Sequence, residues 1–238
     1  MGKCSQFATL FYGNAKHWII CTQIKHSTVF TTMKRTKSGK AWMREHVTDP
    51  YVKQAKAQGY RSRSAFKLME IDDKDRLIRP SEIVVDLGAA PGGWSQVAVE
   101  RIKENGRVLA VDILEMEPIP GVEFIQGDFC NEEVWRDLEA ILGKKQICLV
   151  MSDMAPNISG VSVSDQARMM HLAELGMDFS INRLKSDGVF LVKVFHGHGF
   201  DDFVRKMKQV FRYVSTRKPE ASRDRSAETY MLGRGLMV

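Results

Sequence analysis

A glycine-rich stretch that follows an apolar run is the part of this sequence best suited to cofactor chemistry. Asp86-Leu87-Gly88-Ala89-Ala90-Pro91-Gly92-Gly93-Trp94 ends the run 83–85, and a second acid, Asp112, ends the next run at 108–111. A strand that turns into a helix through glycines, with an acid after the following strand, is typical of a nucleoside-cofactor pocket. Because the spacing is not that of G-x-G-x-x-G, an adenosine cofactor without phosphate, such as S-adenosylmethionine, fits better.

Four charged residues stand within or beside other patterned segments, where they could take part in a reaction. Asp153 directly follows one apolar run, Lys193 interrupts another, Glu228 directly precedes a third, and Lys67 lies in the first half of a predicted helix. A lysine inside an apolar strand must be ion-paired, face an open site or lose its proton. Each also has a purely structural interpretation: a surface charge for Lys67 and Glu228, a turn-forming acid for Asp153, and a buried ion pair for Lys193.

Apolar runs that alternate with helical patterns predict the elements that position these residues. Strands are expected at 83–86, 108–112, 122–126, 147–153, 189–195 and 230–232. Helices are expected at 62–74, 92–104, 131–142, 164–184 and 200–211. This alternation favours a parallel sheet covered by helices on both faces, with ligands beyond the carboxyl ends of the strands. If the last strand is antiparallel, its start, which Glu228 precedes, lies at that same edge.

The chain of 238 residues is long enough for one well-buried domain. Residues 1–32 contain no Asp or Glu and show no clean amphipathic period, whereas Met33 opens a basic stretch typical of a natural amino terminus. We interpret residues 1–32 as a non-conforming extension, with a mitochondrial presequence as the competing interpretation, although the segment has no Arg. Residues 33–238 are then a single domain with a basic amino-terminal segment.

The net charge of +6 is concentrated in two clusters. Between residues 34 and 67 there are ten Lys or Arg residues against two acids, and between 205 and 225 there are eight against two. Two such clusters on either side of a cofactor-type core indicate a polyanionic substrate held through its phosphates, which favours nucleic acid.

Composition also excludes several classes of protein. No apolar run approaches the roughly 20 residues that a membrane-spanning helix needs. The four cysteines form no C-x-x-C pair, which favours a reducing cytosol over a disulfide framework. The six histidines show no metal-ligand spacing, so no metal is expected.

Six segments, in order over about residues 40–232, closely resemble the FtsJ-type 2′-O-ribose methyltransferases. They are 61–68, 86–94, 126–129, 151–157, 192–195 and 218–223. The resemblance implies a Rossmann-like class I methyltransferase that depends on S-adenosylmethionine, with a mostly parallel seven-stranded sheet and helices on both faces. It is greatest to the bacterial branch that acts on ribosomal RNA of the large subunit.

The resemblance also implies roles for particular residues. A catalytic tetrad falls on Lys67, Asp153, Lys193 and Glu228, and cofactor contacts fall on Gly92, Trp94, Asp112, Asp128 and Asp153. By analogy, Asp112 accepts hydrogen bonds from the ribose hydroxyls of the cofactor, and Asp128 accepts one from the adenine amine. Lys193 acts as general base, which requires a neutral amine; burial and Lys67 favour that state, whereas Asp153 and Glu228 oppose it. The alternative is a charged Lys193 that only orients the hydroxyl.

The substrate that the resemblance implies is a uridine ribose in the A-loop of 23S ribosomal RNA, within the large subunit, for a monomeric enzyme of the bacterial cytoplasm. Methylation of tRNA, of mRNA caps or of mitochondrial ribosomal RNA is the alternative within the family. Enzymes that methylate base amines are disfavoured because Asp153 is followed by Met-Ala-Pro rather than Pro-Pro-Tyr, and cytosine carbon-5 enzymes because no Pro-Cys occurs. A catalytically inactive RNA-binding assembly factor would show a broken tetrad or a blocked glycine turn.

Overall fold

The computed structural model describes residues 48–157, 159–223 and 226–237. The predicted extension 1–32 and the basic residues before Lys53 therefore lie outside the described residues, and our interpretation of them stays a prediction.

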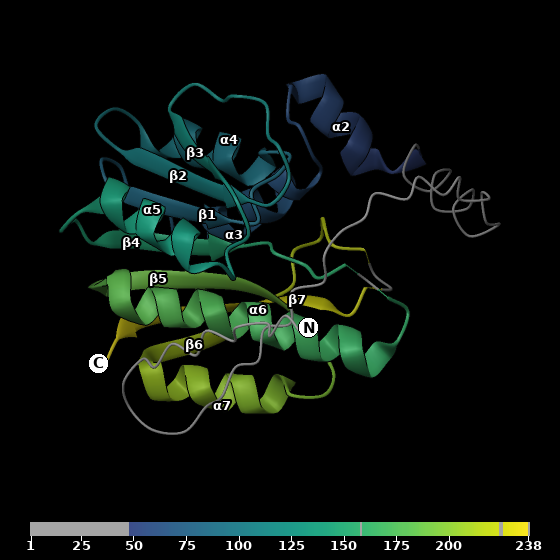
Figure 1. Ribbon diagram of the computed structural model, residues 1–238. Helices are drawn as coiled ribbons and strands as arrows, with labels where there is room; N and C mark the ends of the chain where they lie inside the picture. Colours follow the sequence, from purple (N-terminus) through teal and green to yellow (C-terminus); the bar gives the residue numbers. More distant parts are fainter. Residues whose placement is uncertain (1–47, 158, 224–225, 238) are drawn as a thin grey trace, which may run out of the picture.

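A seven-stranded sheet forms the centre of the molecule (Figure 1). Its strands are β1 (Ile83–Leu87), β2 (Arg107–Asp112), β3 (Val122–Gln126), β4 (Ile147–Ser152), β5 (Leu184–Phe195), β6 (Phe211–Arg217) and β7 (Glu228–Leu236). The order across the sheet is β3-β2-β1-β4-β5-β7-β6. All neighbours up to β5 are parallel, whereas β7 runs antiparallel to both β5 and β6. The predicted mostly parallel α/β sheet is confirmed.

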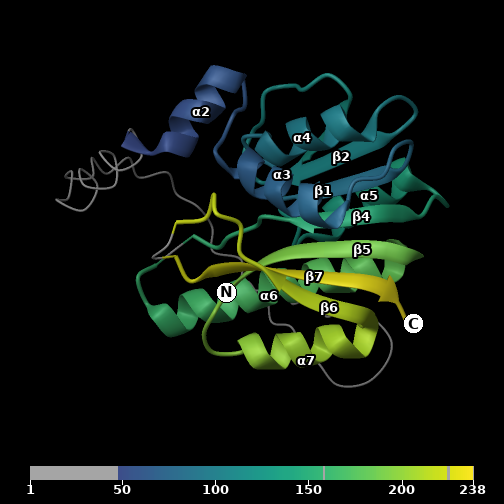
Figure 2. The ribbon, with the colours of Figure 1, turned by 180° about the vertical axis from the view of Figure 1, so that it is seen from behind.

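Helices cover both faces of this sheet, as Figures 1 and 2 show from opposite sides. They are α2 (Pro50–Gln58), α3 (Ser64–Asp75), α4 (Gly93–Ile102), α5 (Glu132–Leu142), α6 (Ser162–Arg183) and α7 (Phe200–Val210). Buried side chains of α5, α6 and α7 pack on one face, and those of α3 and α4 pack on the other.

The strands are continuously apolar because both of their faces are buried. In β4, Leu149 and Met151 join the core beneath α3 and α4, whereas Val150 between them joins the core beneath α5, α6 and α7. Successive side chains of a strand point to opposite faces, so a strand covered on both sides cannot alternate with polar residues. Lys193 in β5 is therefore the exception that a chemical role would explain.

Two elements were not among those that the apolar pattern predicted. Strand β6 closes the sheet beside β7, and α2 precedes α3. Helix α2 starts where the Asp49 side chain accepts hydrogen bonds from the backbone N–H groups of Tyr51 and Val52, with Pro50 in the first turn. An Asp cap followed by Pro is a favourable helix start, which outweighs the weak apolar pattern of this segment. Strand β5 also begins at Leu184 rather than at residue 189.

Candidate active site

The segments at the ends of four strands bring the chemically conspicuous residues to one edge of the sheet. Asp128 lies two residues beyond β3, Asp112 ends β2, the glycine-rich turn follows β1, and Asp153 follows β4. The backbone N–H of Asp153 donates to the carbonyl of Leu87 at 3.0 Å, which joins the end of β4 to the start of the glycine turn. Because parallel strands end at the same edge, four segments that are far apart in sequence meet there.

The glycines of the turn are required by its shape. Gly88 and Gly92 have φ angles of 77° and 108°, in the left-handed region that side chains disfavour. A Cβ atom at Gly88 would lie 2.7 Å from the backbone nitrogen of Met154, and one at Gly92 would lie 2.6 Å from Cδ1 of Ile119. The turn is thus closely packed against the loops after β2 and β4.

Acceptor groups suited to a nucleoside lie beside this turn. The Asp112 carboxylate accepts hydrogen bonds from the backbone N–H groups of Ala90 and Leu114, each at 2.8 Å. The Asp128 carboxylate accepts one from Cys130 at 2.9 Å. Each carboxylate oxygen can accept two hydrogen bonds, so both acids keep free acceptor capacity for ribose hydroxyls or an adenine amine. The donor and acceptor set therefore fits S-adenosylmethionine.

The side chain of Trp94, one of the expected cofactor contacts, belongs to the core. The indole is 2% exposed, donates from Nε1 to the carbonyl of Ser64 at 2.8 Å, and lies against Tyr230 with ring centroids 5.6 Å apart. Trp94 is also the second residue of α4, where backbone N–H groups lack intrahelical acceptors. A cofactor contact by this residue would therefore come from its backbone.

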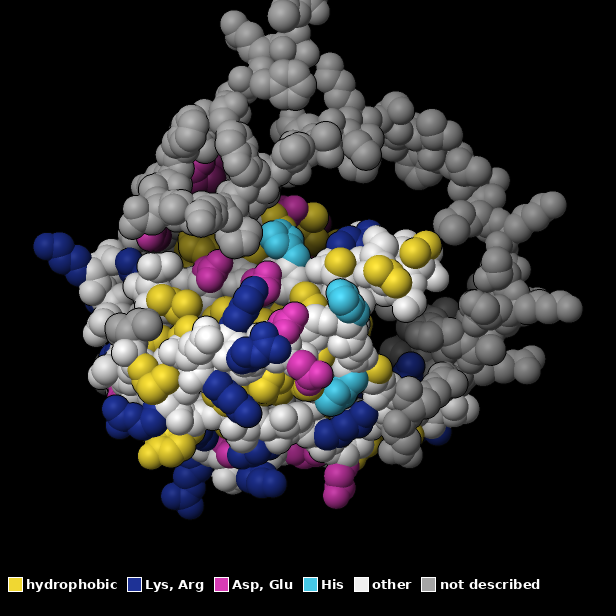
Figure 3. All heavy atoms as spheres, turned by 90° about the horizontal axis from the view of Figure 1, so that it is seen from below, with side chains coloured by type: hydrophobic (Ala, Val, Ile, Leu, Met, Phe, Trp, Pro, Cys, Tyr) yellow, Lys and Arg dark blue, Asp and Glu magenta, His cyan; other side chains and the backbone are white. Residues whose placement is uncertain are grey.

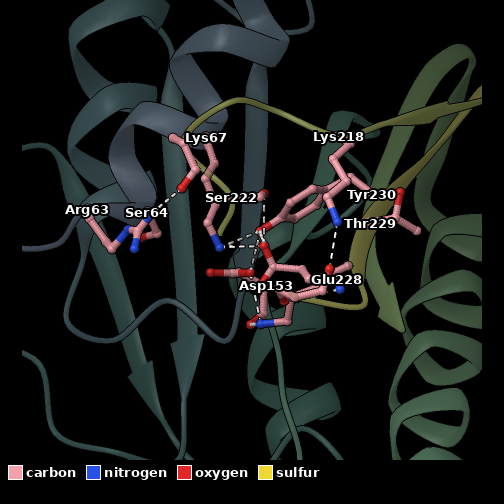
Figure 4. Close-up of polar contacts among 12 residues, drawn as sticks. Arg63, Ser64, Lys67, Asp153, Lys218, Ser222, Glu228, Thr229 and Tyr230 are labelled. Carbon is pink, nitrogen blue, oxygen red and sulfur yellow. Dashed lines mark hydrogen bonds and ion pairs between the residues drawn. The ribbon is translucent and has the colours of Figure 1, made fainter. Parts of the chain in front are cut away.

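Three of the four charged residues predicted to form a tetrad, Lys67, Asp153 and Glu228, lie together in Figure 4, and the fourth, Lys193, contacts Asp153. Nζ of Lys193 is 2.9 Å from Oδ1 of Asp153 and donates to the Asp153 carbonyl at 2.5 Å. Nζ of Lys67, from α3, donates to Oε1 of Glu228 at 2.5 Å. Glu228 faces Phe195 across the antiparallel β5–β7 pair, so the first residue of β7 lies at the edge where β5 ends.

Tyr230 joins the two ion pairs and was missed in the sequence. Its hydroxyl lies 3.0 Å from Oδ1 of Asp153, 3.3 Å from Oε1 of Glu228 and 3.4 Å from Nζ of Lys67. A phenol carries one hydrogen, so Tyr230 donates to the nearer Asp153 oxygen and accepts from Lys67. No signal in the sequence distinguishes this tyrosine from an ordinary core residue of a strand.

Burial raises the pKa values of Tyr230 and Asp86. Tyr230 is fully buried, and burial with the nearby carboxylates of Asp153 and Glu228 holds its pKa well above the usual value, so its hydroxyl keeps its proton and serves as a donor. Asp86, also fully buried, accepts a hydrogen bond from Oγ of Ser95 at 2.7 Å. Burial raises the pKa of Asp86 to about 7.

The basic clusters divide into paired and solvated side chains. On the face formed by α7, Figure 3 shows basic and acidic side chains interspersed, and Arg205 and Lys206 there pair with Asp202 and Glu174. Nearer the site, Arg63 pairs with Asp49 and donates to the carbonyl of Ala221. The exposed lysines Lys53 and Lys56 lie on the adjoining α2.

Among the residues that the structure describes, neither a membrane-spanning helix nor a metal-binding cluster is found. None of their helices has the length and apolar content that crossing a membrane requires. No three His, Cys, Asp or Glu side chains among them are grouped so that they could hold a metal ion.

The mostly parallel seven-stranded sheet, the glycine turn after β1 and the acids after β2 and β3 define a Rossmann-like class I methyltransferase. A sequence model described as FtsJ-like methyltransferase matches residues 60–236, and the chain belongs to this family. Its members use S-adenosylmethionine as methyl donor, and this chain is a methyltransferase with the same cofactor. The predicted family, fold and cofactor are confirmed.

Relatives are close over most of the chain. It is 61% identical over 204 residues to the ribosomal RNA large subunit methyltransferase E of Dechloromonas aromatica, covering 86% of this chain and 100% of that protein. It is 54% identical to the protein of the same name from Marinobacter nauticus, and the match covers 87% of this chain and 100% of that protein. A solved Plasmodium falciparum structure, described as a candidate ribosomal RNA methyltransferase, superposes with a TM-score of 0.68 at 30% identity, covering 75% of this chain and 99% of that one.

Proposed function

We propose that this enzyme transfers a methyl group from S-adenosylmethionine to the 2′-hydroxyl of a ribose in large-subunit ribosomal RNA. The names of its relatives, at 54–61% identity, support the substrate class. The observation that carries the proposed chemistry is the buried amine of Lys193, held 2.9 Å from Asp153 beside the glycine turn. An amine in that position can receive or orient the proton of a hydroxyl group.

S-adenosylmethionine, when bound, would supply a methyl group carried by a sulfonium sulfur, and this sulfur is left as a neutral thioether after transfer. The protein then has to hold the donor in place. Asp112 and Asp128 accept hydrogen bonds from its ribose and adenine, and Gly92 lets the backbone approach it. The N–H groups of Gly93 and Trp94 at the start of α4 suit its carboxylate, because a helix amino terminus attracts anions.

Lys193 and Asp153 act on the acceptor hydroxyl. Asp153 takes two contacts from Nζ of Lys193, one through its carboxylate and one through its carbonyl. These two contacts fix the direction of the amine. The third position on its nitrogen is left for the acceptor hydroxyl. From this position Lys193 would accept the proton of the ribose hydroxyl or orient that hydroxyl for transfer. Since a ribose hydroxyl is a weak acid, orientation in line with the methyl group contributes much of the rate.

The pair of Lys67 and Glu228 supports this arrangement. Both side chains are mostly buried, with 12% and 14% exposed, so each compensates the charge of the other. Oγ of Ser222 donates to the same Glu228 oxygen at 3.2 Å. We infer that Lys67 and Glu228 hold the acceptor ribose and set the charge around Lys193. The complete set of four tetrad residues and the presence of glycine at 88 and 92 argue against a catalytically inactive assembly factor.

The finer substrate is part of the same proposal. We infer a uridine of the A-loop of 23S ribosomal RNA, reached within the large subunit by a monomer in the bacterial cytoplasm. Lys53, Lys56 and Lys218 are candidates for phosphate contacts, which position an RNA without reading its bases.

Mapping of ribose methylation tests the proposal. Ribosomal RNA from cells with and without the gene should differ by one 2′-O-methyl group in the large subunit, and purified enzyme should restore it. Lys193→Ala should abolish transfer while the affinity for S-adenosylmethionine stays within about threefold of wild type. A methyl group found on tRNA instead, or near-normal turnover by Lys193→Ala, would contradict the substrate or the role of Lys193, respectively.

A further inference from the structure

Arg61 connects two loops that meet over the proposed cofactor site. Its guanidinium donates from Nη1 to the carbonyls of Pro91 and Glu117, and from Nη2 to the carbonyl of Pro118 at 2.8 Å. Pro91 belongs to the glycine-rich turn, and Glu117 and Pro118 belong to the loop between β2 and β3. Three carbonyl oxygens from two segments thus converge on one side chain, which the planar, multidentate guanidinium suits well.

The loop between β2 and β3, residues 113–121, forms one side of the glycine turn. It starts directly after Asp112, and Met116 and Ile119 within it pack on Ala89 and its neighbours. A Cβ atom at Gly92 would lie 2.6 Å from Ile119, 3.0 Å from Met116 and 3.3 Å from Nη1 of Arg61. The loop and Arg61 therefore enclose Gly92, beside which the methyl donor is proposed to bind. Movement of the loop would open this proposed binding site.

The position of Arg61 is itself fixed from α4. The side-chain amide of Gln96 accepts from the backbone N–H of Arg61 at 2.8 Å and donates to the carbonyl of Gly59 at 3.0 Å. The hydroxyl of Tyr60 donates to Glu100 of the same helix at 2.7 Å. The segment between α2 and α3 is thus held along α4, and Arg61 reaches from it across the glycine turn to the loop.

We propose that Arg61 is a positioning residue that keeps loop 113–121 closed over bound S-adenosylmethionine and so sets how long the cofactor stays bound. This role rests on the proposed cofactor site. The Arg61 guanidinium donates to the carbonyls of Pro91, Glu117 and Pro118 rather than to a residue of the tetrad, so it acts on cofactor retention and not on the methyl-transfer step. Closing contacts of this kind change the dissociation rate more than the association rate.

The test compares Arg61→Ala, Arg61→Lys and a matched control, Arg136→Ala. Arg136 is an exposed residue of α5 and loses the same charge without touching loop 113–121. Cofactor affinity and dissociation are measured with S-adenosylmethionine alone, by calorimetry and stopped-flow fluorescence. Hydrogen exchange of residues 113–121 in the cofactor-free protein reports the loop directly, and thermal unfolding reports whether each variant is folded.

Arg61→Ala should raise the dissociation constant about tenfold, mostly through faster dissociation, because charge-assisted hydrogen bonds are lost. The KM for the cofactor should rise in parallel, kcat at saturating cofactor should stay within about threefold, and exchange in loop 113–121 should speed up. Arg61→Lys should recover part of the affinity, and Arg136→Ala should match wild type. Suppose that Arg61→Ala shows wild-type cofactor affinity and wild-type hydrogen exchange in loop 113–121, while Asp112→Ala binds the cofactor poorly. That result would overturn the role of Arg61 and leave the cofactor site standing. Unimpaired binding by Asp112→Ala would overturn the cofactor site and the role of Arg61 with it.

Discussion

Tyr230 lies directly opposite Lys193 in the antiparallel pairing of β5 and β7, and both side chains contact the same oxygen of Asp153. The distances to Oδ1 of Asp153 are 3.0 Å from the tyrosine hydroxyl and 2.9 Å from the lysine amine. This oxygen therefore has two donors from neighbouring strands, and the orientation of the carboxylate depends on both. The direction of the Lys193 amine in turn depends on that carboxylate.

Removal of the Tyr230 hydroxyl should impair catalysis without unfolding the protein. In Tyr230→Phe, Asp153 loses a donor worth about 1.5–3 kcal/mol, so kcat should fall by about 10- to 100-fold. The ring stays packed on Trp94, so the melting temperature should fall by no more than about 3–12 °C and the protein stays folded in the assay. Methyl transfer under saturating cofactor measures the effect, and Tyr213→Phe, at an exposed position of β6, is the control. Equal activity of the two variants would show that the carboxylate needs no second donor.

The pair of Lys67 and Glu228 should show strong energetic coupling. Each single variant, Lys67→Met or Glu228→Gln, leaves the other group poorly compensated in a mostly buried place and should cost about 1–3 kcal/mol of unfolding free energy. The double variant should cost less than the sum, with a coupling of at least about 1 kcal/mol in a urea-unfolding cycle. The exposed pair of Arg205 and Asp202 should give no more than about 0.5 kcal/mol. Additive single effects in the buried pair would refute the coupling.

Substitution of two glycines at positive φ should distinguish an effect on stability from an effect on cofactor binding. Gly92→Ala and Gly59→Ala both place a side chain at positive φ, at a cost of about 1–2 kcal/mol each. At Gly59 nothing lies within 4 Å of the added Cβ, whereas at Gly92 it meets Ile119 at 2.6 Å. Gly92→Ala should therefore also weaken cofactor binding by at least about tenfold, while Gly59→Ala should bind normally in calorimetry. The same affinity in both variants would mean that the turn does not shape the site.

The sequence was most informative where a charged side chain lies within or beside an apolar strand. Lys193 interrupts a run that is buried on both faces, so it could be expected to be ion-paired, to face an open site or to lose its proton. Its grouping with Asp153 was implied only by the family resemblance, and the structure places the two in contact. Glu228 could be placed because a strand at the end of such a fold reaches the same edge when it is antiparallel. These inferences need only strand periodicity and the cost of burying a charge.

Other parts of the site depend on tertiary contacts that no local pattern encodes. A tyrosine at position 230 fits a core strand equally well, and only the meeting of β4, β7 and α3 gives its hydroxyl three polar neighbours. The indole of Trp94 lies in the core for the same reason, although its position in the motif suggested a cofactor contact. Helix α2 had a local signal, an Asp cap followed by Pro50, that its weak apolar pattern concealed.

Asp86 should make the stability of the cofactor-free protein depend on pH. Burial raises its pKa from the ordinary 3.8 to about 7 in the folded state, so the folded protein holds a proton that the unfolded chain releases above pH 4. Folding then takes up a proton, and this contribution to stability is present at low pH and is lost as the pH rises through about 7. Between pH 5 and pH 8 the free energy of unfolding should fall by about 2–3 kcal/mol through this group.

Asp86→Asn should remove this dependence, because an amide cannot ionise and still accepts the hydrogen bond from Ser95. Urea unfolding at several pH values should therefore show wild type and variant diverging as the pH rises, with the variant relatively more stable at pH 8. Profiles that run parallel from pH 5 to pH 8 would mean that Asp86 is already ionised in the folded protein at the lower pH. In that case its unpartnered oxygen Oδ1 would have to be solvated, although it is buried in the structure.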